Sequence, residues 1–196
     1  METNLAGTVG SCVLTGVVVG GVIYAVTIYN GLVALKHAVG RAWRNIDVLL
    51  KQRHDELPEL VETCKQHKNF EVAALERVME ARTAAQIARK TGDVQGVGVA
   101  ENTLRAGLDS IFAVAASYPD LKTSRSFQQL LERISALEEA IADRREFYNA
   151  AVTNNNVRIE QFPDSVVAKR FDFTAADSLE FNAVEIADIE PGQLFA

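Results

Sequence analysis

Residue types that define whole classes of protein are scarce in this chain of 196 residues. It has two cysteines, four prolines and one tryptophan. Two cysteines cannot build a disulfide-rich scaffold, and they match no zinc-ligand spacing. Basic residues are outnumbered, because the net charge is −6 and the pI is about 5.2. This balance excludes a generally basic nucleic-acid-binding protein, so we expect no nucleic-acid partner.

Catalytic signatures are missing as well. The chain contains no Gly-x-Ser-x-Gly and no His-Glu-x-x-His motif, and the glycine-rich stretch 92–98 lacks the Lys-Ser/Thr of a phosphate loop. Cys64, His67 and Glu71 share one helical face, but no second helix offers a His or Cys partner. We therefore predict no catalytic activity, no cofactor and no metal. An enzyme or a metal-binding protein is kept as the second alternative.

Charged residues are missing from the N-terminal region. No Asp, Glu, Lys or Arg occurs from residue 3 to residue 35. A helix needs about 20 apolar residues to cross a bilayer, and residues 5–28 supply them. A cleaved signal peptide is the alternative, but no positive charge precedes the apolar run and no small-x-small cleavage site follows it. We predict an uncleaved transmembrane anchor over residues 1–28, in contact with the lipid bilayer.

Basic residues follow this anchor and none precedes it. The first five are Lys36, Arg41, Arg44, Lys51 and Arg53. The positive-inside rule then predicts the N-terminus outside and the remainder of the chain in the cytoplasm.

Small residues recur along the anchor at a spacing of four: Cys12, Gly16 and Gly20. Small residues on one face let two membrane helices approach closely. This pattern predicts self-association, and hence a homo-oligomer. The alternative is the ordinary glycine content of membrane helices.

Residues 29–163 show a helical period, with hydrophobic residues at alternating spacings of three and four, as in a coiled-coil seam. Pro58 is expected to kink the first helix or restart it, and the first clear turn is expected at residues 90–98. Pro119 and Pro163 are expected to end the third and fourth helices. The pattern predicts an all-α fold in which the membrane helix leads into an antiparallel four-helix bundle.

Two finer features concern the fourth helix. Ser126 and Gln129 form a capping box that predicts its N-terminus. Asn155 falls in its hydrophobic column, where an asparagine typically fixes helix register.

Residues 164–196 lack a sustained helical period, and every charged residue after Arg170 is acidic. We expect an irregular acidic tail. Its alternation of acidic and hydrophobic residues favours docking on a neighbouring subunit or partner as an extended strand, with Phe173 and Phe181 as contacts. A disordered solvating tail is the alternative.

An ordered series of short blocks extends over residues 28–181 and resembles the LemA family. The residues that carry the resemblance, and that we take as candidate packing or interaction residues, are Tyr29, Asn30, Trp43, Asp47, Pro58, Tyr118, Pro119, Tyr148, Asn149, Asn156, Phe162 and Pro163.

The resemblance implies a bacterial single-pass inner-membrane protein with an antiparallel helical bundle and no established catalytic residues. One branch of the family helps to build magnetosome membranes, and family genes often accompany membrane metallopeptidases. This chain departs from the family where a second Tyr-Asn pair is replaced by Asn155-Asn156 and a Gly-Phe pair by Asp172-Phe173. Charge is also added before the proline by Glu56.

Together these features favour a membrane-anchored helical scaffold or interaction protein that self-associates. The alternative is an accessory subunit of a membrane metallopeptidase or another membrane complex, with a membrane protein as its partner.

Overall fold

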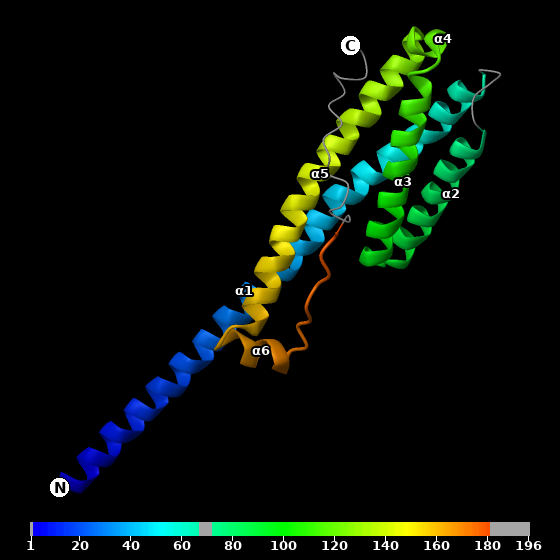
Figure 1. Ribbon diagram of the computed structural model, residues 1–196. Helices are drawn as coiled ribbons and strands as arrows, with labels where there is room; N and C mark the ends of the chain where they lie inside the picture. The colour runs from blue at the N-terminus through cyan, green and yellow to red at the C-terminus, as the bar shows by residue number, and fades with distance from the viewer. Residues whose placement is uncertain (1, 67–71, 181–196) are drawn as a thin grey trace. The chain divides into compact units, whose positions relative to one another are not determined.

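The computed structural model describes residues 2–66 and 72–180, with side chains from residue 13 onward except that of Lys122. The chain forms helices α1 (Glu2–Lys65), α2 (Val72–Thr91), α3 (Val94–Ala115), α4 (Pro119–Lys122), α5 (Arg125–Glu160) and α6 (Asp164–Arg170) (Figure 1). The described ranges contain no strand. The predicted all-α fold is confirmed.

The described residues form two compact units. The first, here called the α6 unit, comprises residues 2–41 and 151–176. The second, the bundle unit, comprises residues 42–66, 72–150 and 177–180. Helices α1 and α5 each contribute residues to both units. The division predicted at residues 28 and 163 stays a prediction.

Cross-helix pairs show that neighbouring helices of the bundle unit are antiparallel. Arg82 of α2 bonds to residue 54 of α1, and Arg89 of α2 bonds to residue 47 of α1. Later residues of α2 thus contact earlier residues of α1, which means that the two helices run in opposite directions. Helix α5 opposes α1 for the same reason, because its residues 133 and 138 pair with residues 56 and 53. A tight turn then reverses the chain from α2 into α3. The predicted antiparallel helix bundle is therefore present in this unit.

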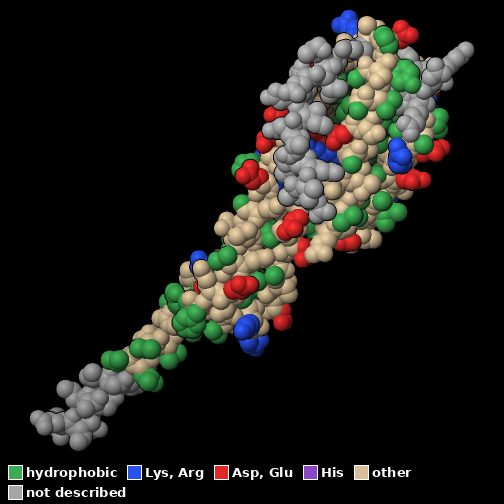
Figure 2. Space-filling view, viewed as in Figure 1, with side chains coloured by type: hydrophobic (Ala, Val, Ile, Leu, Met, Phe, Trp, Pro, Cys, Tyr) green, Lys and Arg blue, Asp and Glu red, His purple; other side chains and the backbone are tan. Residues whose placement is uncertain are grey.

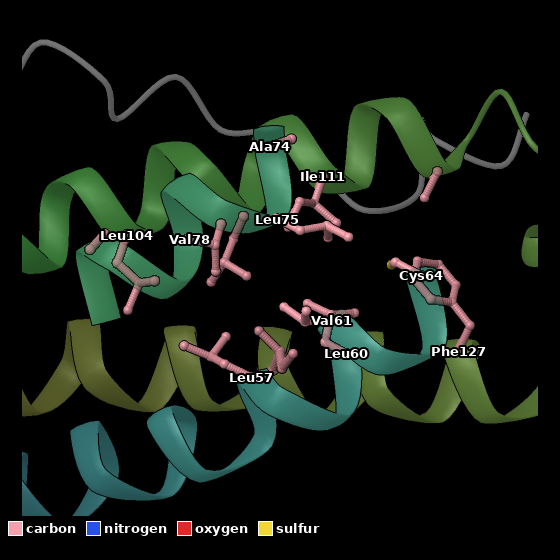
Figure 3. Packing of buried hydrophobic residues seen from close by; sticks show 14 of the residues in the cluster. Leu57, Leu60, Val61, Cys64, Ala74, Leu75, Val78, Leu104, Ile111 and Phe127 are labelled. Carbon is pink, nitrogen blue, oxygen red and sulfur yellow. The ribbon is translucent and has the colours of Figure 1, made fainter. Parts of the chain in front are cut away.

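The core of the bundle unit is apolar and receives side chains from α1 through α5 (Figure 3). On α1, the buried residues Leu57, Leu60 and Cys64 follow the predicted spacing of three and four. Burying a leucine side chain completely stabilises a fold by about 1.5–3 kcal/mol. The fully buried leucines are distributed over all the long helices of the unit: Leu50, Leu57, Leu60, Leu75, Leu104, Leu108 and Leu130.

Helix α1 continues through Pro58, so of the two expected outcomes, a kink or a restart, the restart is wrong. Proline has no N–H, and the carbonyl of His54, four residues earlier, therefore lacks its usual helical donor. The Nε of Arg82 in α2 donates to this carbonyl at 2.7 Å. A side chain from the neighbouring helix thus replaces the missing bond, which explains why the helix does not end here.

The first helix break comes earlier than predicted, because α1 ends at Lys65 and α2 begins at Val72. The turn predicted at residues 90–98 is confirmed at its start. Gly92 has φ +72°, a conformation that favours glycine. The Asp93 carboxylate then accepts a hydrogen bond from the Gly96 N–H at 2.8 Å and caps α3.

Two expectations about helix ends are corrected. Pro119 does not stop the third helix, which ends at Ala115; it begins α4, where the missing N–H costs nothing. Helix α5 is capped by Ser124 rather than Ser126, because the Ser124 hydroxyl accepts the Phe127 N–H at 3.5 Å. Helix α5 ends at Glu160, before Pro163 as predicted.

The expected irregular tail begins later than residue 164, because residues 164–170 form α6. This short helix lies against α1 (Figure 1), where its Ala168 packs with Ile28 and Leu32. Residues 173–180 have no regular secondary structure, as predicted. The predicted contact Phe181 lies outside the described residues.

Candidate functional site

A cluster of charged side chains is buried inside the bundle unit. Arg53 of α1 is only 2% exposed, and it occupies the core-facing column between Leu50 and Leu57. Glu101 of α3 is similarly buried, between Val97 and Leu104. Helix α1 thus has a positive charge and α3 a negative charge at positions where the alternating spacing of three and four residues would normally place a hydrophobic core residue.

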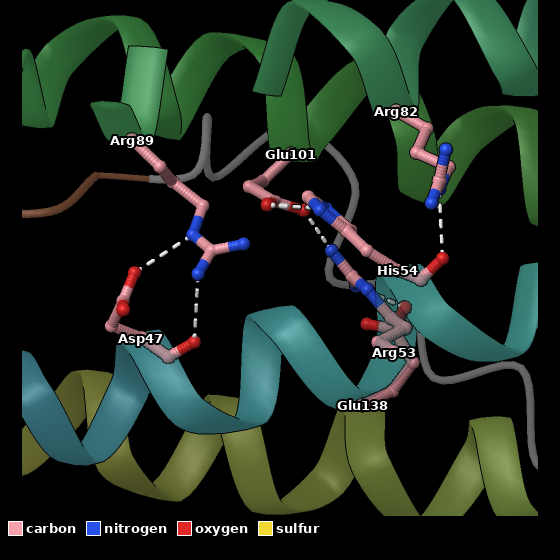
Figure 4. Close-up of polar contacts among 7 residues, drawn as sticks. All are labelled: Asp47, Arg53, His54, Arg82, Arg89, Glu101 and Glu138. Atoms are coloured by element: carbon pink, nitrogen blue, oxygen red, sulfur yellow. Dashed lines mark hydrogen bonds and ion pairs between the residues drawn. The ribbon is translucent and has the colours of Figure 1, made fainter. Parts of the chain in front are cut away.

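The two charges meet, and two further side chains join them (Figure 4). The Arg53 guanidinium donates through one terminal nitrogen to Glu101 and through the other to Glu138 of α5. Nε2 of His54 lies 3.0 Å from Oε1 of Glu101. One arginine thus connects three helices, with a planar fork that suits two carboxylates.

The cluster is not fully hydrogen-bonded. Among the described side chains, the buried atoms Arg53 Nε, His54 Nδ1 and Nε2, and Glu101 Oε1 have no aligned hydrogen-bond partner. An adjacent cavity of about 20 Å³ is lined by Arg53, Glu101 and residues of α3 and α5. A water molecule needs about 10–15 Å³, so this cavity has room for roughly one. It is far too small for an organic substrate.

A second polar connection joins α1 and α2 nearer the start of the bundle unit. Nε of Arg89 donates to Oδ1 of Asp47 at 2.8 Å, and its Nη2 donates to the Asp47 carbonyl at 3.1 Å. The predicted residue Asp47 is therefore an interhelical contact (Figure 4).

The extended segment after α6 is held by asparagine side chains of α5. In the bundle unit, Nδ2 of Asn149 donates to the Leu179 carbonyl at 3.0 Å, and the Leu179 N–H donates to Oδ1 of Asn149 at 2.8 Å. The carboxamide thus pairs with the backbone as a neighbouring strand would. The Tyr148 hydroxyl donates to the Asp177 carbonyl at 2.8 Å.

Two other features of the bundle unit support this contact. The Leu179 side chain is fully buried. Gly98 of α3 lies so close to the segment that an added Cβ would be 2.5 Å from the Glu180 carbonyl oxygen. Only glycine fits there without a shift of the backbone. Burial, and then the charge of Asp177, raise the pKa of Tyr148.

The α6 unit contains an equivalent contact. Nδ2 of Asn156 donates to the Ala176 carbonyl at 2.9 Å, and the Ala176 N–H donates to Oδ1 of Asn156 at 2.9 Å. The buried Asn155 donates to the same Oδ1 at 3.2 Å and thereby orients the Asn156 side chain. Asn156 therefore binds backbone in the same way as Asn149, one heptad earlier in α5.

The other predicted residues lie mainly in aromatic contacts. In the α6 unit, Tyr29 meets Phe171 edge-on at 4.9 Å between ring centroids, and Phe173 at 5.8 Å. In the bundle unit, the rings of Trp43 and Tyr148 lie 5.4 Å apart. Phe173 is thus an internal contact in this structure, whereas Phe162 is 84% exposed.

The remaining predicted residues have simpler places. Tyr118 packs partly buried against the core at the start of α4, and Pro163 precedes α6. Asn30, Gly16 and Gly20 are exposed on α1. The side chain of Cys12 lies outside the described set.

The described residues bring together no group of three or more metal-ligating side chains. His67 and Glu71 of the weighed metal site lie outside the described residues. Cys64 is buried in the apolar core, and this burial raises the pKa of its thiol to about 12.

Sequence reasoning missed the charged cluster, although a signal for it existed. Extending the 3/4 spacing of α1 from Leu50 to Leu57 includes Arg53, and the spacing of α3 from Val97 to Leu104 includes Glu101. Both positions fall outside a purely hydrophobic pattern, because each carries a charge. Two residues of opposite charge at core positions of neighbouring helices predict a buried ion pair.

Comparison with known proteins identifies the family of the chain. The model of the LemA family matches residues 42–190. The magnetosome proteins MamQ 1 and MamQ 2 of Paramagnetospirillum magneticum are each 23% identical over 190 residues, covering 85% of this chain and 70% of theirs. Protein LemA of Metamycoplasma hominis is 24% identical over 180 residues, covering 89% of this chain and 80% of its own. The matched region includes the whole charged cluster and both asparagine contacts, and the chain belongs to the LemA family.

Proposed function

We propose that the protein is a single-pass scaffold of the bacterial inner membrane, with its helical body in the cytoplasm, and that it self-associates without catalysing a reaction. One observation carries the proposal: every described residue of α1 from 13 to 27 is exposed, and the segment has no Asp, Glu, Lys or Arg. Figure 2 shows hydrophobic side chains along this part of the helix.

An exposed apolar helix of this length suits lipid better than water. Contiguous apolar surface is unfavourable in water, whereas a helix satisfies its own backbone groups inside a bilayer. Among the described helices, α1 is the one long and apolar enough to cross a membrane.

The charges that follow the apolar segment support a cytoplasmic body. Lys36, Arg41, Arg44 and Lys51 are all exposed on α1. Their position after the segment, with no basic residue before it, follows the positive-inside pattern. Arg53 differs from these four because it is buried against Glu101.

The buried cluster supports a structural rather than a catalytic role. Its acids and its basic groups contact one another directly, and the cavity beside them is about 20 Å³, whereas ligand pockets are typically about 300–1,000 Å³. Buried polar groups of this kind are best attested as determinants of helix register. We assign the cluster the role of fixing how the helices of the bundle align.

Self-association is assigned to the glycine face of α1. An added Cβ at Gly16 or Gly20 would meet nothing within 4 Å, so this face is open in a single chain. A second copy could approach closely there, as small-xxx-small faces allow.

The native cysteines permit a direct test in membranes. By its spacing, Cys12 shares the face of Gly16 and Gly20, and two such faces in contact would place the Cys12 residues within disulfide range. Cys64 should not form a disulfide under these conditions, because it is buried and its pKa is raised to about 12. Mild oxidation of native membranes should therefore give a disulfide-linked dimer that Cys12→Ser abolishes.

The test variant replaces both glycines of the face, Gly16→Ile with Gly20→Ile. The control variant is Gly21→Ile, because Gly21 lies about 100° around the helix from Gly20. We expect the first pair to abolish the dimer and the control to keep it. A chain that alkaline carbonate releases from the membrane would overturn the anchor. A monomer in wild-type membranes would overturn self-association, and one stoichiometric membrane partner found by crosslinking would favour the accessory-subunit alternative.

A further inference from the structure

The α6 unit has an outward face, and of its residues only Phe171 takes part in a contact described above, the edge-on contact with Tyr29. Ala168 is buried against Ile28 and Leu32 of α1, and Val167 packs beside it. The opposite face of α6 carries Val166, Lys169 and Arg170, which follow the i, i+3, i+4 spacing of one helix face and are all exposed. One side of α6 therefore binds α1, and the other side faces outward.

Exposed aromatic rings flank this face. Phe162 precedes α6 and is 84% exposed, and Phe171 follows it and is 56% exposed. The Arg170 guanidinium lies 5.9 Å from the centre of the Phe171 ring. We call the five residues Phe162, Val166, Lys169, Arg170 and Phe171 the α6 face. Figure 2 shows basic side chains over α6.

The α6 face lies at a defined level along α1. Residues 5–28 form a helix about 36 Å long at 1.5 Å per residue, which already exceeds the roughly 30 Å of a bilayer core. Helix α6 packs on Ile28 and Leu32, and the first charge after the apolar segment is Lys36. Helix α6 is thus held where α1 would leave the hydrocarbon.

The chemistry of the face matches that level. Aromatic rings with basic side chains are typical of segments that lie in the headgroup layer, where the rings insert and the cations meet lipid phosphates. The nearby acid Asp164 is buried and bound by Arg158, so it does not face outward. The exposed acids next to the face in sequence are Glu160 and Asp172, one beyond each end, whereas the basic residues Lys169 and Arg170 lie on the face itself.

We propose that the α6 face docks in the headgroup layer of the membrane that holds α1 and binds anionic phospholipid there. This inference rests on the proposed membrane anchor. It gives the protein a second attachment to the bilayer, formed by residues more than 130 positions after the apolar segment.

Site-specific fluorescence of the full chain in nanodiscs of phosphatidylcholine and phosphatidylglycerol can test this. An environment-sensitive dye is attached to a single cysteine at Val18, Val166 or Ile87, in a Cys12→Ala chain whose buried Cys64 does not react. Ile87 of α2 is the control, because it is exposed and belongs neither to the apolar segment of α1 nor to the α6 face. Quenchers are placed on lipids near the headgroup or deep in the acyl chain.

We expect deep quenching at Val18, headgroup-level quenching at Val166 and none at Ile87. Val166 behaving like Ile87 while Val18 is quenched would overturn this inference and leave the anchor standing. Loss of quenching at Val18 would instead overturn the anchor.

The charge requirement can be tested separately. A basic residue near an anionic surface changes the docking equilibrium by about fivefold. Lys169→Gln with Arg170→Gln should therefore weaken headgroup-level quenching at Val166 in anionic nanodiscs, while Lys90→Gln on α2 should not. Equal quenching in the double variant, or in pure phosphatidylcholine, would show that anionic lipid is not the ligand.

Discussion

The two ends of α1 reverse the usual relation between polarity and burial. Residues 13–27 are apolar and exposed, whereas Arg53 and His54 are polar and buried. In a single aqueous solvent both arrangements would be unfavourable. They become reasonable when the first segment has lipid as its solvent and the second has Glu101 and Glu138 as partners. The surroundings of a residue therefore decide whether its exposure is favourable.

The largest expected effect comes from breaking the buried charge pair. Arg53→Met leaves Glu101 buried without its cation, which typically costs about 3–5 kcal/mol. Arg133→Met removes the solvent-accessible pairs with Glu56 and Glu59 and should cost about 0–1 kcal/mol. Chemical denaturation followed by helical circular dichroism in detergent measures both. Equal losses would mean that burial does not distinguish the two pairs.

The next effect compares one substitution at two exposed valines of α1. Val18 is 58% exposed and Val48 is 56% exposed. Lysine at a membrane-helix centre costs about 2.5–3.5 kcal/mol of insertion free energy, whereas an exposed substitution in water usually changes stability by less than about 0.5 kcal/mol. Val18→Lys should lower the membrane-inserted fraction strongly, and Val48→Lys should leave it unchanged. If both valines lie in water, both variants will behave alike.

A smaller effect is expected at the asparagine contacts. Asn149→Ala leaves the Leu179 N–H and carbonyl without their partner, and because each would cost about 1–3 kcal/mol if it stayed buried, release of the segment into water is the less costly outcome. The segment 177–180 should therefore be released rather than strained. Hydrogen exchange of the Leu179 amide should speed up in this variant and in Gly98→Ala. Asn154→Ala, at an exposed position of α5, is the control that should retain wild-type protection.

The smallest expected effect is on how the free energy of unfolding depends on pH, and it comes from Cys64. Its pKa is raised from 9.0 to about 12 by burial, so the folded state retains a proton that the unfolded state loses. The stability due to this thiol is complete below about pH 9 and is lost as the pH rises toward 12. Between about pH 9 and pH 12, the free energy of unfolding should therefore fall less steeply with pH in Cys64→Ala than in the wild-type chain. Chemical denaturation repeated at several pH values in this range measures both slopes. Parallel slopes would contradict the assigned burial.

Hydrophobic spacing predicted the helices well, because each helix buries a column that can be read within a single segment. The apolar N-terminal segment and the column through Leu57 and Leu60 could be predicted without knowledge of neighbouring helices. Arg53 and Glu101 were missed because their burial depends on each other, and they are 48 residues apart. The same limit applies to Pro58, whose tolerance depends on Arg82.

Helix ends were less predictable for a local reason. Ser124 and Ser126 are both good capping residues, and the choice depends on which hydroxyl reaches a free N–H once the chain has turned after α4. Helix α6 was missed because seven residues are too few to show a period. Its helicity follows from packing on Ile28 and Leu32, which lie at the other end of the sequence.

The bond between Arg82 and the His54 carbonyl has a consequence for the order of assembly. During synthesis, residues 54–58 leave the ribosome before Arg82 does, and the interval between donor and acceptor is 28 residues. Until α2 docks, the helix around Pro58 lacks one of its bonds and is its weakest turn. Docking of α2 therefore completes the backbone bonding of α1 around Pro58, and the nascent segment stays bendable until α2 arrives.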